Sequence, residues 1–265
     1  MGNLLSRVVV GLVGLPVVLA LVWAGGWWLF GLLVAAAVVA LHEFWQMTRE
    51  LRPLAAAGYS GAVLALVGAE LGGVGWMVAG FLATFPLAFA FKGVAETTAP
   101  ATVAVGATVL GSAWVGFGLA FVVLLRAIPE HAVLTVFTIL LAVFANDTFA
   151  YFAGRLFGRH KLAPTISPGK TWEGFLVGSA AAVAVAFFAL YRQGFLAVWQ
   201  SVVLGVVIAV AGPTGDLFES ALKRDMGVKD TGRILGGHGG MLDRVDAILF
   251  VSVASYYLLD AFHRV

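Results

Sequence analysis

The sequence predicts an all-α, polytopic membrane protein, and three observations support this fold class. Of the 265 residues, 61% are hydrophobic and only 11% are charged, whereas a soluble domain carries about 25% charged residues. The apolar residues form runs that are mostly too long for strands. These runs also lack the alternation of a transmembrane β-barrel. Because lipid cannot hydrogen-bond the backbone, the runs are expected to be transmembrane helices.

A membrane-spanning helix needs about 20 apolar residues, and about nine runs of this kind are expected. The first run is interpreted as a retained span, because a second run begins at Trp27 without a clear signal-peptide cleavage site before it. The fifth run is expected to be interrupted near Gly111 or Gly116. The predicted spans are residues 6–24, 27–42, 54–71, 74–91, 101–126, 132–154, 174–191, 196–214 and 246–263.

The basic residues indicate how the helices are oriented. With the N-terminus in the cytoplasm, 13 of the 16 Lys and Arg residues lie on the cytoplasmic side, and only Arg126, Arg192 and Arg264 lie opposite. Such a bias is typical of cytoplasmic loops. We therefore expect a multi-pass protein of the cell inner (plasma) membrane whose active site faces the cytoplasm. The net charge of +2 does not suggest a nucleic-acid partner, and the absence of Cys excludes disulfides and thiolate chemistry.

Polar residues concentrate in the second half of the chain. We expect N-terminal transmembrane helices over residues 1–130, holding spans one to five, and a C-terminal catalytic region over residues 131–265. Two long polar segments, 155–173 and 215–245, are predicted to be its cytoplasmic loops. The sequence Gly212-Pro-Thr-Gly215 is expected to end the helix before the second loop.

Three carboxylates are expected to converge there from two helix ends. Asp243 and Asp246 are three residues apart at the start of the last span and would share a helix face, while Asp216 lies at the end of the preceding span. Oxygen ligands without Cys favour Mg²⁺ over Zn²⁺. Acidic metal ligands among basic phosphate-binding residues are typical of phosphoryl or nucleotidyl transfer. The basic residues are Lys223, Arg224, Lys229, Arg233 and Arg244.

A second polar group extends from Asn146 to Gly174. Asp147 lies inside an apolar span, where an ionisable residue usually has a function, although it could instead pair with a nearby Arg. Elsewhere, His42-Glu43 at the end of the second span lacks the second His of a zinc-protease motif. That dipeptide is interpreted as lying at the membrane interface.

Residues 220–246 carry a motif that resembles the signature of the phosphatidate cytidylyltransferases (CDP-diacylglycerol synthases). The matching positions cover 27 residues and depart from the family at Gly236, where Pro is common. The 146–174 segment is similar to the other stretch that the family shares, so the likeness covers roughly residues 140–250. The signature reads Ser220-x-Leu-Lys223-Arg224-x4-Lys229-Asp230-x-Gly232-x2-Leu-Gly236-x-His238-Gly239-Gly240-Met-x-Asp243-Arg244-Val-Asp246.

The resemblance implies that CTP and phosphatidic acid react to give CDP-diacylglycerol and diphosphate, with the lipid drawn from the bilayer. It also implies Mg²⁺ dependence, a second cation such as K⁺ and a homodimer. The residues assigned to catalysis are Asp216, Lys223, Arg224, His238, Asp243, Arg244 and Asp246, of which Asp216, Asp243 and Asp246 would hold the metal, with Asp147 as a further candidate. His238 could either orient a phosphate or donate a proton. The residues assigned to CTP or phosphate binding are Asn146, Asp147, Ser167, Lys170, Thr171, Ser220, Lys229, Asp230, Arg233, Gly239 and Gly240.

Two alternative functions fit parts of the pattern. A CTP-dependent lipid phosphotransferase, such as a polyprenol-type kinase, would use the same metal and basic residues but release CDP. An ion-coupled transporter would use Asp147 and Asp216 as a cation pathway. Its charges should lie near the bilayer midplane, between two related halves of the chain, whereas the charges here cluster at one face.

Overall fold

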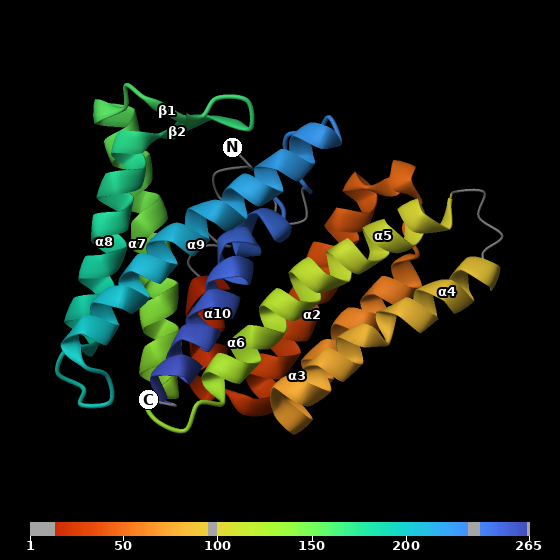
Figure 1. The fold of residues 1–265 in the computed structure, drawn as a ribbon, viewed down its shortest axis with the longest axis horizontal. Helices are drawn as coiled ribbons and strands as arrows, with labels where there is room; N and C mark the ends of the chain where they lie inside the picture. Colours follow the sequence, from red (N-terminus) through yellow and green to blue (C-terminus); the bar gives the residue numbers. More distant parts are fainter. Residues whose placement is uncertain (1–13, 95–99, 233–238, 264–265) are drawn as a thin grey trace. The chain divides into compact units, whose positions relative to one another are not determined.

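The computed structural model describes residues 14–94, 100–232 and 239–263, and these residues are almost entirely helical (Figure 1). Seven helical segments are long and apolar enough to cross a membrane. The all-α, multi-pass prediction is therefore confirmed, whereas the count of nine spans is not. The first predicted span lies partly outside the described residues, and its described part, Gly14–Ala24, is an apolar helix.

The chain divides into two compact units. The first unit comprises Met1–Leu124 and Met226–Val245, and the second comprises Leu125–Asp225 and Asp246–Val265. The segment Met226–Val245 thus groups with the N-terminal helices, although the sequence analysis assigned it to the C-terminal region. The division of the chain near residue 130 stays a prediction.

The first unit contains a helix that folds back on itself. Helix α2 (Gly26–Met47) is followed by the short 3₁₀ helix η1 (Arg49–Leu51), by α3 (Ala55–Leu82) and by α4 (Thr84–Val94). Within α3, Gly73 has a φ of 69°, and Gly80 packs against the backbone of Leu64. In a straight helix these two residues would lie about 24 Å apart, so the chain reverses at Gly73. The reversal falls between the spans predicted at 54–71 and 74–91.

The predicted interruption near Gly111 or Gly116 takes the form of a wider helical turn. Helix α5 (Ala101–Gly111) continues through a π-helical stretch, Ser112–Phe117, into α6 (Gly118–Arg126). Gly111 packs against the rings of Trp45 and Phe44 on α2. Such π-helical turns occur inside continuous α-helices, so the fifth span is widened and not broken.

The second unit contains α7 (Ala132–Phe157), α8 (Trp172–Leu190), α9 (Val198–Asp225) and most of α10 (Leu242–His263). Helices α7 and α8 lie side by side, and a small antiparallel hairpin connects their ends (Figure 1). The hairpin strands are β1 (Lys161–Ala163) and β2 (Ser167–Thr171). The side chain of Thr171 caps α8 by accepting a hydrogen bond of 3.1 Å from the Gly174 amide.

The expected helix end at Gly212–Gly215 is wrong, because α9 runs through Pro213 to Asp225. Proline removes one amide donor from a helix, and membrane helices tolerate this loss where neighbouring groups compensate. The Ala209 carbonyl lacks the amide donor that a residue other than proline at position 213 would supply, and at the neighbouring position the Thr214 hydroxyl donates to the Val210 carbonyl over 2.7 Å. The two predicted loops are accordingly shorter and more structured than expected: residues 215–225 are helical, and the hairpin occupies much of 155–173.

Replacing Gly80 with Ala should destabilise the first unit by about 1–3 kcal/mol, because a Cβ there would overlap the Leu64 carbonyl. Gly75→Ala is the matched control, since a Cβ at Gly75 meets no atom within 4 Å. Thermal unfolding in detergent should show a lower Tm for Gly80→Ala and an unchanged or higher Tm for the control. Equal Tm values would contradict the fold-back at Gly73.

Candidate active site

Three carboxylates meet in the second unit. Oxygens of Asp216, Glu219 and Asp246 all lie within 4.8 Å of one another. Asp216 and Glu219 are three residues apart on α9 and therefore share a face, while Asp246 lies in the second turn of α10. Gly215 allows the two helices to approach, because a Cβ there would overlap the Asp246 carbonyl. Glu219 and Asp246 are buried, at 1% and 8% exposure, so their charges require compensation.

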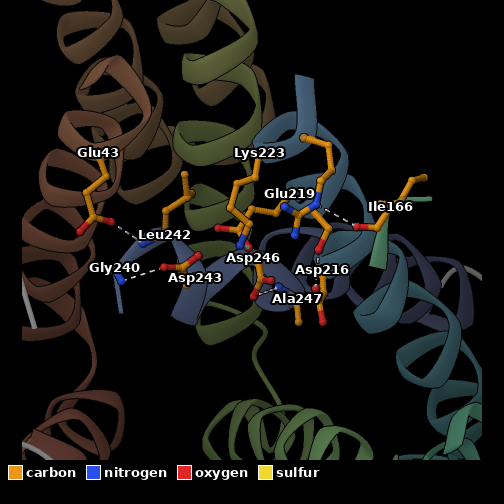
Figure 2. A network of polar contacts seen from close by, with 12 residues as sticks. Glu43, Ile166, Asp216, Glu219, Lys223, Gly240, Leu242, Asp243, Asp246 and Ala247 are labelled. Carbon is orange, nitrogen blue, oxygen red and sulfur yellow. Dashed lines mark hydrogen bonds and ion pairs between the residues drawn. The ribbon is translucent and has the colours of Figure 1, made fainter. Parts of the chain in front are cut away.

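Two lysines provide positive charge at this carboxylate cluster. Lys223 Nζ lies 2.9 Å from Glu219 Oε2, one helical turn along α9 (Figure 2). Lys170 Nζ lies 2.8 Å from Asp216 Oδ2. The Ser220 hydroxyl donates to Asp216 Oδ1 over 3.3 Å. Among the described residues, the cluster thus combines three carboxylates with two ammonium groups.

The β-hairpin brings Lys170 to the cluster. Lys170 lies in β2, directly before the helix-capping Thr171, and its Nζ also donates to the Pro213 carbonyl over 3.4 Å. Ser167 begins the same strand and pairs with Ala163. Arg224 Nε donates to the Ile166 carbonyl over 3.3 Å and links the end of α9 to the hairpin. The predicted residues Lys170, Ser220, Lys223 and Asp216 are therefore brought together, with Thr171 and Arg224 holding the supporting backbone.

Asn146 and Asp147 lie on α7 in the same unit. Asn146 is 1% exposed, and neither of its side-chain polar atoms has a hydrogen-bond partner among the described residues. It packs against Gly178 of α8 and near Gly212 of α9. Asp147 is exposed, and its charge interacts with those of Asp216 and Lys170. The charge of Asp147 therefore interacts with the carboxylate cluster, whereas the Asn146 side chain is buried between α7, α8 and α9.

The remaining described residues of the signature belong to the first unit. Asp243 is outside the carboxylate cluster among the described residues, and its Oδ2 accepts a hydrogen bond of 2.7 Å from the Gly240 amide (Figure 2). Gly239 has a φ of 81°, a conformation that favours glycine. Arg244 and Lys229 are exposed. Two predicted site residues, Arg233 and His238, lie outside the described residues.

Asp230 lines a cavity of about 780 Å³ in the first unit. The cavity lies between the end of α2, the start of α3 and the signature segment, and polar as well as aromatic side chains surround it. His42 contributes a ring that contacts Gln46 over 2.8 Å and the Tyr59 hydroxyl over 3.3 Å. The lining residues are His42, Trp45, Gln46, Met47, Arg49, Ala55, Tyr59, Val228, Asp230 and Thr231.

Sequence reasoning missed two acidic residues. Glu219 is one of them, and its spacing of three residues from Asp216 and four from Lys223 is the signal that places all three on one helix face. Glu43 was interpreted as interfacial, yet it is fully buried. Its Oε2 accepts a hydrogen bond of 2.9 Å from the Leu242 amide. No local pattern around His42-Glu43 reveals this contact, because its partner is 199 residues away.

Carboxylates flanked by lysines could serve several kinds of phosphate chemistry, and comparison with known proteins distinguishes among them. Residues 5–262 match the family described as "Cytidylyltransferase family". The chain belongs to the cytidylyltransferase family. Membership makes it a nucleotidyltransferase, and neither the polyprenol-type kinase nor the transporter is favoured.

Two mycobacterial relatives resemble this chain over nearly its whole length, and a staphylococcal relative resembles about half of it. Phosphatidate cytidylyltransferases of Mycobacterium bovis and Mycobacterium tuberculosis are each 35% identical over 286 residues. These alignments cover 97% of this chain and 88% and 82% of the two relatives, respectively. A phosphatidate cytidylyltransferase of Staphylococcus haemolyticus is 44% identical over 140 residues, covering 52% of this chain and 53% of that relative.

The carboxylate cluster has the ligand chemistry of a divalent-cation site. Hard cations prefer carboxylate oxygens, and Mg²⁺ commonly takes one or two of them and completes its shell with water and phosphate. Asp216 is the most accessible of the three, with 41% of its side chain exposed. A bound cation could therefore contact both the buried carboxylates and a nucleotide phosphate from outside.

Removing the Lys223 charge should destabilise the second unit. Lys223→Met leaves Glu219 buried among carboxylates, and breaking a buried ion pair by removing one partner costs about 3–5 kcal/mol. The double variant Lys223→Met/Glu219→Leu should recover much of this loss. Thermal unfolding without added divalent cations would measure both, with the exposed Lys161→Met as control. A Tm for Lys223→Met equal to that of Lys161→Met would contradict the proposed charge balance.

Proposed function

We propose that the protein transfers the cytidylyl group of CTP to phosphatidic acid, giving CDP-diacylglycerol and diphosphate, as a step of phospholipid biosynthesis. The observation that carries the proposal is the cluster of Asp216, Glu219 and Asp246 with Lys170 and Lys223 at its edge. Membership of the cytidylyltransferase family and the names of its relatives supply the nucleotide and the lipid.

The reaction forms one bond and breaks another at the α-phosphorus of CTP. A phosphate oxygen of phosphatidic acid attacks that phosphorus, the bond to the bridging oxygen of the β-phosphate breaks, and diphosphate leaves with the bonding electron pair. The attacking oxygen is already ionised at neutral pH, so no strong base is needed. The main barrier is the approach of two polyanions, which positioning and positive charge lower.

Asp216, Glu219 and Asp246 would hold Mg²⁺ in this proposal. The ion would neutralise phosphate charge and polarise the α-phosphoryl group when bound. Asp147 is a further candidate ligand because its charge lies near that of Asp216. Asp243 is proposed to act from the start of α10, where it orders the Gly240 amide. A second cation such as K⁺ remains part of the proposal on the basis of the family resemblance alone.

Lys170 is proposed to stabilise the diphosphate as it leaves. Its ammonium group contacts Asp216 and the Pro213 carbonyl, and 23% of the side chain is exposed. A lysine at the edge of the cluster can therefore exchange a carboxylate partner for a phosphate oxygen. Lys223, which is more deeply buried, would maintain the charge balance of Glu219. The roles assigned to the remaining residues stay predictions: Arg224, Arg244 and His238 in catalysis, and Asn146, Ser167, Thr171, Ser220, Lys229, Asp230, Arg233, Gly239 and Gly240 in CTP or phosphate binding.

The membrane setting follows from the substrates. The acyl chains of phosphatidic acid stay in the bilayer, while CTP comes from the aqueous side. Most Lys and Arg residues lie in the predicted cytoplasmic segments. This distribution supports a protein of the cell inner membrane whose active site faces the cytoplasm. A homodimer is included in the proposal because the resembled family implies it.

Purified protein supplied with labelled CTP and phosphatidic acid should form CDP-diacylglycerol and diphosphate only when Mg²⁺ is present. Chelation with EDTA should stop the reaction, and added Mg²⁺ should restore it, because phosphate oxygens and carboxylates share the ion. Product analysis by chromatography distinguishes diphosphate from CDP. Release of CDP with a phosphorylated alcohol would overturn the proposal in favour of a lipid kinase.

Asp216→Asn and Asp246→Asn should each lower kcat by about 10²-fold or more, in line with the loss of other strong electrostatic contributions. Asp225→Asn is the matched control, since Asp225 is an exposed carboxylate at the end of the same helix. Size-exclusion chromatography in detergent should show all three variants folded. Near-normal turnover of either cluster variant would remove its carboxylate from the metal assignment.

A further inference from the structure

We propose that Glu43 is a positioning residue for the signature segment, acting from a helix that lies about 200 residues earlier in the chain. Its carboxylate fixes the backbone at the start of α10 and thereby the placement of Asp243 and Asp246. The inference rests on the proposed function for its kinetic consequences. The contact itself lies wholly within the first unit.

Glu43 holds the first turn of α10 directly. The Leu242 amide donates to Glu43 Oε2 over 2.9 Å (Figure 2), and Leu242 is the first residue of that helix. The first amides of a helix have no intrahelical acceptor, and the partial positive charge there favours a carboxylate. Glu43 and Leu242 are both fully buried, so water cannot replace this hydrogen bond.

Two glycines of the signature segment leave room for the carboxylate. A Cβ at Gly232 or at Gly240 would overlap the carboxylate of Glu43. The buried Thr231 hydroxyl borders the same position at Gly240. Residues on both sides of the 233–238 stretch therefore pack around one acidic side chain. An apolar side chain of similar size could fill the space, but it could not accept the Leu242 hydrogen bond.

The anchored turn carries residues that the proposed function uses. Gly240 donates its amide to Asp243 next to the anchored Leu242. Asp246 lies four residues beyond Leu242, about 6 Å along the same helix. A displacement of the first turn of α10 therefore displaces both carboxylates, and Glu43 acts on them through the Leu242 backbone.

Two substitutions of Glu43 separate the effect of its side-chain length from the effect of its charge. Glu43→Gln keeps the chain length and one oxygen acceptor but removes the charge. Glu43→Asp keeps the charge but withdraws the oxygens by one methylene. The control is Glu50→Asp, at an exposed acidic residue of η1. Each variant is assayed for kcat, for the KM of CTP and for the Mg²⁺ concentration that gives half-maximal activity.

We expect Glu43→Gln and Glu50→Asp to stay within about threefold of the unsubstituted protein. Glu43→Asp should lose about tenfold or more in kcat/KM and require more Mg²⁺, because a buried amide is left without its acceptor and the metal ligands move. Hydrogen–deuterium exchange supplies a readout independent of turnover. The peptide covering residues 239–246 should exchange about tenfold faster in Glu43→Asp than in Glu43→Gln.

Several results would overturn the inference. A larger loss in Glu43→Gln than in Glu43→Asp would show that the charge of Glu43, and not the reach of its oxygen to Leu242, is needed. Unchanged kinetics and exchange in Glu43→Asp would show that the contact positions nothing. If Glu43→Asp has a lower Tm and exchanges faster throughout the first unit, Glu43 contributes to the general packing of that unit and does not specifically position α10. If the unsubstituted protein shows no turnover, the proposed function fails, while the exchange experiment still decides whether Glu43 anchors α10.

Discussion

The mutual repulsion of three carboxylates constrains the second unit of this protein. Two unit charges 4 Å apart in a protein interact by about 4 kcal/mol at an effective dielectric constant of 20, and Asp216, Glu219 and Asp246 lie within 4.8 Å of one another. Nearby cations relieve this repulsion. Lys223 supplies one from the same helix, and Lys170 supplies another from the β-hairpin. Each element contributes charged groups to the cluster: the hairpin supplies Lys170, the unbroken α9 supplies Asp216, Glu219 and Lys223, and the start of α10 supplies Asp246.

Glycine sets how closely the helices approach. Lipid offers no hydrophobic driving force between helices, so association depends on close packing at small residues and on buried polar contacts. Gly215 brings α9 against the backbone of α10, and Gly80 brings the returning half of α3 against Leu64. Gly240 does the same for the Glu43 carboxylate. In each case the missing side chain permits a polar or backbone contact that a larger residue would prevent.

Much of the architecture could be predicted from the sequence because lipid restricts a spanning segment to a few backbone conformations. The apolar runs revealed the helices, and the polar signature, which includes Lys223 and Asp246, indicated the family. The course of α9 could not be predicted, because whether Pro213 ends a helix depends on neighbouring groups that compensate for its missing amide. The contact of Glu43 with Leu242 was equally hidden, since it depends on packing between distant segments and not on local periodicity.

Pro213 also has a mechanical consequence for α9. Because proline has no amide hydrogen, the Ala209 carbonyl receives no intrahelical hydrogen bond from it, and helices bend most readily at such points. Residues Asp216, Glu219 and Lys223 all lie beyond this point, on a stretch of regular helix. A small change of the helix angle at Pro213 would therefore move these three charged side chains together. The N-terminal part of α9, which holds the buried Leu204 and Ile208, would keep its position. Pro213 thus separates the apolar part of α9 from the part that carries Asp216, Glu219 and Lys223.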